Sequence, residues 1–74
     1  MEEYTTSDII LAATLMAIGH TLQNITLHGT KGTFHFVNIN EQTIADYSLG
    51  KILVNPIIHN GFVKQLTTAV RRMK

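Results

Sequence analysis

The chain of 74 residues has no cysteine, no tryptophan and one proline, and charged residues make up only 15% of it. The absence of cysteine excludes disulfides, thiolate metal ligands and cysteine nucleophiles. A small domain without disulfides fits a reducing compartment better than secretion, so the expected location is the cytoplasm. The low charged content leaves few residues to keep a monomer's surface soluble, which favours self-association. A net charge of +1 does not by itself indicate a nucleic-acid partner.

The chain also lacks a long hydrophobic run. Residues 9–18 form the longest apolar stretch, and a helix that spans a bilayer needs about 18 or more such residues. Glu2 and Glu3 stand ahead of this stretch, where a signal peptide carries basic residues. We therefore expect no membrane insertion and interpret residues 9–18 as part of a core or interface helix.

The hydrophobic content of 45% argues against disorder and predicts one α+β domain over residues 1–74, with residues 1–4 as a flexible acidic arm. Helix caps, turn residues and hydrophobic periodicity predict the order α-β-β-α-α, with an antiparallel hairpin packed on helices. The predicted elements are a helix at 8–18, strands at 21–28 and 33–39, a short helix at 41–49 and a last helix at 56–73.

Two glycines mark the hairpin turn. Gly29 and Gly32 bound a predicted four-residue turn, and positive φ is expected at both. Phe34 is expected to share one face of its strand with Phe36. His28 and His35 flank the turn and are expected to lie near one another across the strands.

The helix at 8–18 is apolar on every side, and such a helix must be covered on every side. Because the chain has little left to cover it, we expect a homodimer or a higher homo-oligomer. Ala13 and Ala17 lie four residues apart and permit close approach of a second helix. The predicted interface residues are Ile9, Ala13, Met16 and Ala17.

Short motifs along the whole chain follow the order of a known family: Thr6-Ser7-Asp8, Leu11-Ala12, Gly19, Phe34-His35-Phe36, Asp46-Tyr47, Gly50, Val54 and Phe62. Over residues 5–73 this pattern resembles a family of small bacterial and phage proteins, domain of unknown function 5659. The chain departs from that family at Val37-Asn38, where an acidic residue is usual, and at Ser48-Leu49, where members often carry an aromatic residue and asparagine. The resemblance implies a phage or mobile-element origin, and hence the host cytoplasm, but no activity.

The residues that carry chemistry do not form a catalytic pattern. The histidines are His20, His28, His35 and His59, and no two of them have the H-x-x-x-H spacing of a helical metal site. The sequence also lacks the G-x-S-x-G elbow and the glycine-rich phosphate loops. We therefore expect neither an enzyme nor a bound metal or cofactor.

The basic residues gather towards the end of the sequence, at Lys51, Lys64, Arg71, Arg72 and Lys74. They form either a solvated helix face or a site for a phosphate-bearing ligand, on whose base Tyr47 would stack.

The functional hypothesis is a small non-enzymatic protein that binds and blocks or sequesters a host molecule, which is either a protein or a phosphate-bearing ligand. Two alternatives stay open. One is a nucleic-acid-binding regulator that uses the basic last helix. The other is a sponge for a nucleotide second messenger, with the ligand between subunits.

Overall fold

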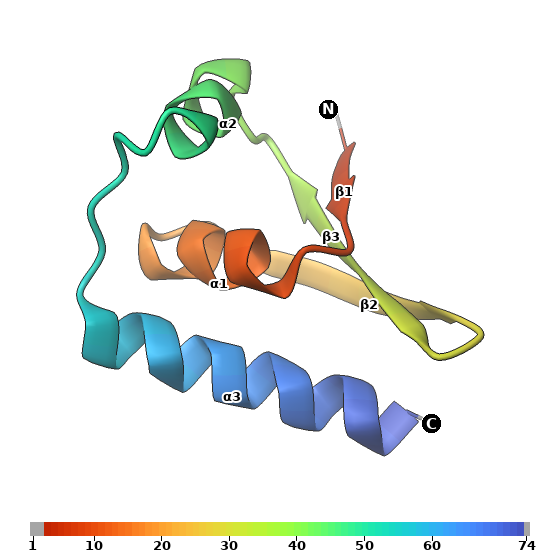
Figure 1. Ribbon diagram of the computed structural model, residues 1–74. Coiled ribbons are helices and arrows are strands. Elements are labelled where there is room, and N and C mark those ends of the chain that lie inside the picture. The colour runs from red at the N-terminus through yellow and green to blue at the C-terminus, as the bar shows by residue number, and fades with distance from the viewer. Residues whose placement is uncertain (1–2, 74) are drawn as a thin grey trace.

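The computed structural model describes residues 3–73 as a three-stranded antiparallel sheet packed with three helices (Figure 1). The strand order is β1-β3-β2, so β3 is central and β1 and β2 are the edges. This confirms the predicted α+β class and the hairpin on helices. The elements are β1 (Glu3–Thr6), α1 (Ile9–Ala17), β2 (Leu22–His28), β3 (Lys31–Val37), α2 (Glu41–Ser48) and α3 (Pro56–Met73).

β1 is the element that the sequence prediction lacked. Glu3 and Tyr4 were expected in a flexible arm, but both pair with β3, and Tyr4 also packs against the core. The arm prediction was wrong for these two residues because β3 offers an open edge and the aromatic and β-branched side chains of β1 favour a strand. The other two arm residues, Met1 and Glu2, lie outside the described residues.

The hairpin turn is shorter than predicted. Gly29 and Thr30 form a two-residue turn, with φ of 65° at Gly29 and no positive φ at Thr30. This is the pattern of a type II′ turn, whose twist matches that of the strands. Gly32 belongs to β3 and does not have a positive φ, so the four-residue turn was wrong.

The short turn fixes a register that separates the two histidines of the hairpin. His28 pairs with Lys31, whereas His35 pairs with Asn24. His28 lies four residues after Asn24 on β2, which amounts to about 13 Å along a strand. The expected proximity of His28 and His35 was therefore wrong.

A side-chain oxygen caps the start of each of the three helices. The Asp8 carboxylate accepts from Ile10 N at 2.9 Å and from Leu11 N. Asn40 caps α2 through Gln42 N, and Asn55 caps α3 through Ile57 N at 2.9 Å. Each of these bonds satisfies a donor that the helix itself leaves unpaired.

The core lies between the sheet, α1 and α3. In Figure 1, α1 lies over the sheet and α3 runs beside α1. Phe34 and Phe36 point from β3 into this layer, as predicted from their alternation. The buried hydrophobic residues are Leu11, Ala12, Ala13, Leu15, Phe34, Phe36 and Leu66.

This packing corrects the predicted oligomer interface on α1. Ala13 is 0% exposed within a single copy, so it has no surface to offer a second copy. The prediction for Ala13 was wrong because the sheet and α3 already cover that side of the helix. Ile9 and Met16 are half-buried against the core, and Ala17 is also half-buried.

The hairpin and α3 approach one another most closely at Gly32. A Cβ atom at this position would lie 2.8 Å from Cγ2 of Val70. Valine has one strongly preferred rotamer in a helix, so Val70 cannot easily move aside. A glycine is therefore needed at position 32 because α3 lies too close for a larger side chain. The hairpin turn does not require it.

We predict that Gly32→Ala lowers the free energy of unfolding by about 1–3 kcal/mol, because the added methyl overpacks this contact. Gly61→Ala is the control: it lies inside α3 with nothing within 4 Å of an added Cβ. It should raise the free energy of unfolding by about 0.5–1 kcal/mol. Urea unfolding followed by circular dichroism measures both, and a Gly32 variant as stable as wild type would contradict the close contact.

Candidate functional site

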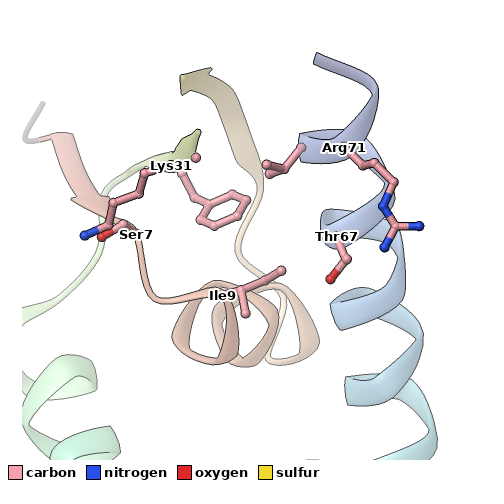
Figure 2. A pocket seen from close by; sticks show the side chains of 8 residues that line it. Ser7, Ile9, Lys31, Thr67 and Arg71 are labelled. Atoms are coloured by element: carbon pink, nitrogen blue, oxygen red, sulfur yellow. The ribbon is translucent and has the colours of Figure 1, made fainter. Parts of the chain in front are cut away.

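A pocket of about 250 Å³ lies between the start of α1, the hairpin and the second half of α3 (Figure 2). Three separate parts of the sequence therefore build it. The lining residues are Ser7, Ile9, Lys31, Gly32, Phe34, Thr67, Val70 and Arg71.

The pocket combines apolar walls with two cations. Ile9 and Val70 supply the accessible apolar surface, and the buried Phe34 lies behind them. In Figure 2, Lys31 lies beside the α1 start, while Arg71 lies on α3 across the pocket. This combination suits a ligand that has an apolar or aromatic body and a negatively charged group.

Two hydroxyl groups complete the rim. The Thr67 hydroxyl donates to the carbonyl oxygen of Val63 at 2.7 Å, so its proton is already used. Ser7 precedes the cap residue Asp8 and is exposed. Donors for a bound anion would therefore come mainly from Ser7, Lys31 and Arg71.

The structure brings only part of the predicted basic cluster to this pocket. Arg71 lines it, whereas Lys64 and Arg72 are exposed elsewhere on α3, and Lys51 is exposed on the crossover between α2 and α3. Lys74 lies outside the described residues. The sequence prediction did not include Lys31 in the site, because only the tertiary approach of α3 to the hairpin brings it to the same pocket as Arg71.

Basic side chains gather on α3, whereas the Asp8 carboxylate lies at the start of α1, next to the pocket residue Ser7. α3 contains no acidic residue, and its Lys64, Arg71 and Arg72 are all exposed. Acidic residues occur on β1 and α2, which lie on the other side of α1 from α3 in Figure 1. The positive potential along α3 is therefore not neutralised by carboxylates of the same helix.

Tyr47 packs against the core and does not line the pocket. It is half-buried against the core, with its hydroxyl near the Asp8 carboxylate. Burial, followed by the charge of Asp8 and its hydrogen bond, raises the pKa of Tyr47 above the ordinary 10.0. Asp8 therefore caps α1 and also raises the pKa of Tyr47 on α2.

A second hollow, of about 450 Å³, lies between β1 and α2. Its apolar lining comes from Tyr4, Ile39 and Ile44, and its charged residues are Glu3 and Glu41. Although it is larger, two carboxylates repel a phosphate, so it does not suit the ligand class that the basic residues indicate.

Two histidines join elements through polar contacts that the sequence prediction missed. On the open face of the sheet, His35 Nδ1 lies 3.4 Å from Glu3 Oε1, and His35 Nε2 lies 2.9 Å from Thr26 Oγ1. Between the helices, His59 Nε2 lies 3.2 Å from Thr14 Oγ1. The strand register and the packing of α3 on α1 produce these contacts, and neither is visible as a sequence motif.

Within residues 3–73, no group of three or more histidine and acidic side chains is arranged to hold a metal ion. In the same part of the chain, no helix has both the length and the hydropathy to cross a membrane. Comparisons with protein-family models, with curated proteins and with solved structures found no match to this chain. The resemblance to domain of unknown function 5659 stays a prediction.

The raised pKa of Tyr47 predicts a loss of stability in alkali. The unfolded chain ionises this tyrosine near pH 10, whereas the folded chain keeps it protonated to higher pH. The contribution of neutral Tyr47 to the free energy of unfolding is present below pH 10. It is lost as the pH rises through the pKa of Tyr47 in the folded chain. Tyr47→Phe should therefore show a smaller fall in the free energy of unfolding than wild type between about pH 9 and 11.

Tyr4→Phe is the matched control, because it removes the other tyrosine hydroxyl and leaves the contact between Tyr47 and Asp8 in place. It should retain the contribution of Tyr47 to the alkaline fall. Urea unfolding at a series of pH values measures all three proteins. Identical pH profiles for wild type and Tyr47→Phe would contradict the assigned contact.

Proposed function

We propose that this protein is a small non-catalytic binding protein that holds a phosphate-bearing molecule in the pocket between the hairpin and α3. The observation that supports this proposal is the placement of Lys31 and Arg71, from separate elements, on either side of an apolar pocket. A phosphate would meet charge-assisted donors, and an attached base or acyl group would meet the half-buried side chains of Ile9 and Val70.

The lining supports binding better than chemical conversion. General acid–base catalysis needs a group that gives or takes a proton near neutral pH, most often histidine or a carboxylate. The residues that line the pocket include neither. Sequestration of a host molecule therefore fits these residues, as does the accessory role that the phage-like resemblance implies.

Self-association is a second part of the proposal. Among residues 3–73, seven large hydrophobic side chains are exposed on one copy, and charged residues make up only 15% of the chain. We expect a homodimer or higher homo-oligomer in the cytoplasm of the host. The exposed residues are Ile10, Ile18, Leu49, Leu53, Ile57, Ile58 and Met73.

A nucleic-acid partner is the second candidate, and the exposed side of α3 favours it. Lys64, Arg71 and Arg72 are all exposed on α3, and Lys64 and Arg71 lie seven residues apart, about 10 Å from one another on one side of the helix. Such a row suits a chain of phosphates better than a single one. The two candidates differ in how strongly binding depends on Arg72, which is exposed but does not line the pocket.

Arg71→Gln and Arg72→Gln separate these candidates by removing the same charge from neighbouring positions. A thermal-shift screen with mononucleotides and cyclic nucleotides should first show a raised melting temperature for wild type. Titration should then show affinity about 10- to 100-fold weaker for Arg71→Gln, because a charged hydrogen bond is lost. Arg72→Gln should bind within about twofold of wild type, since screening reduces the effect of an exposed charge.

A DNA duplex is the second probe in the same screen. Binding to DNA that both variants weaken equally, with a salt dependence reduced by about one charge in each, would favour the nucleic-acid candidate. If neither nucleotides nor DNA change the melting temperature, the proposal of a phosphate-bearing ligand is wrong.

A further inference from the structure

The two edges of the sheet differ in how they are protected. β1 is only four residues long and carries Glu3, and short charged edges resist pairing with another chain. β2 is seven residues long and contains no acidic residue, lysine, arginine or proline. A register shift between Leu22 and Asn24 interrupts its first residues, which leaves 24–28 as a regular edge.

The hairpin turn determines which backbone groups face outward on this edge. His28 and Lys31 flank a two-residue turn and form its hydrogen-bonded pair. Such pairs alternate along an antiparallel ladder, so the N–H and C=O groups of Leu27 and Ile25 point away from β3. Among residues 3–73, no backbone or side-chain hydrogen bond reaches these groups.

We infer that β2 pairs antiparallel with β2 of a second copy and joins the two sheets into one of six strands. The regular edge, 24–28, has Thr26 at its centre, so a two-fold axis through this position pairs every residue of the edge. Thr26 then faces Thr26 of the second copy, Ile25 faces Leu27, and Asn24 faces His28. All ten residues of the paired edges thereby contribute to the ladder.

A second copy fits this edge for two reasons. Two identical antiparallel strands form an isologous contact that closes after two subunits. Because the edge carries no formal charge with histidine neutral, self-pairing places no like charges opposite one another, and threonine pairs are favourable across strands. This inference rests on the proposed self-association, but it places the contact on the β2 edge and not on the exposed hydrophobic side chains, and it is independent of the ligand.

The chain has no cysteine, so a single introduced cysteine can form a disulfide only with another copy. Residues directly opposite one another on antiparallel strands lie within the Cα distance that a disulfide requires. Thr26→Cys should therefore yield a covalent dimer under mild oxidation. Thr33→Cys is the matched control, because Thr33 pairs with Thr26 on the same face but lies on the central strand. It should stay uncrosslinked.

Light scattering on wild type, Thr26→Lys and Thr33→Lys completes the experiment. Wild type and Thr33→Lys should have twice the 8.3 kDa chain mass, whereas Thr26→Lys should be monomeric because two lysines would meet at the axis. Circular dichroism checks that each variant is folded. A monomeric wild type would overturn both the inference and the proposed self-association. A dimer that Thr26→Cys does not crosslink would overturn the β2 contact alone, and neither result bears on ligand binding to Arg71.

Discussion

Close packing around α1 is the constraint on which the rest of the structure depends. Ala12 and Ala13 are fully buried, and their small side chains allow the sheet and α3 to lie near the same helix. With larger residues there, α3 would lie farther from the hairpin, and Val70 would no longer meet Gly32. Val70 and Gly32 form part of the pocket wall, and their contact therefore depends on Ala12 and Ala13, which lie outside the pocket.

Polar contacts at α1 add specificity to this apolar layer. The Thr14 hydroxyl is buried and must be hydrogen-bonded, which it achieves through the carbonyl of Ile10 at 2.9 Å and the imidazole of His59. Only one placement of α3 brings His59 to Thr14. This contact fixes the position of α3 along α1, which hydrophobic burial alone would leave free to slide.

The sequence predicted what local chemistry decides and missed what tertiary contact decides. Asp8 and Asn55 mark helix starts because a side-chain oxygen caps the nearest backbone donors, and that interaction needs only neighbouring residues. By contrast, β1 exists because β3 leaves an edge open, and Ala13 is buried because α3 folds back onto it. Lys31 entered the candidate site for the same reason, since 40 residues separate it from Arg71 in the chain.

The position of the pocket links binding to the stability of α3. Leu66 is the one fully buried residue within Pro56–Met73, so few side chains anchor this long helix. A ligand that contacts both Lys31 and Arg71 would hold α3 against the hairpin and bind only the folded chain. It would then stabilise the fold by mass action, by about 2.7 kcal/mol at 100 times its Kd, a large fraction of the stability of a small domain. For a protein that sequesters its ligand, this coupling makes the bound state the most stable form of the chain.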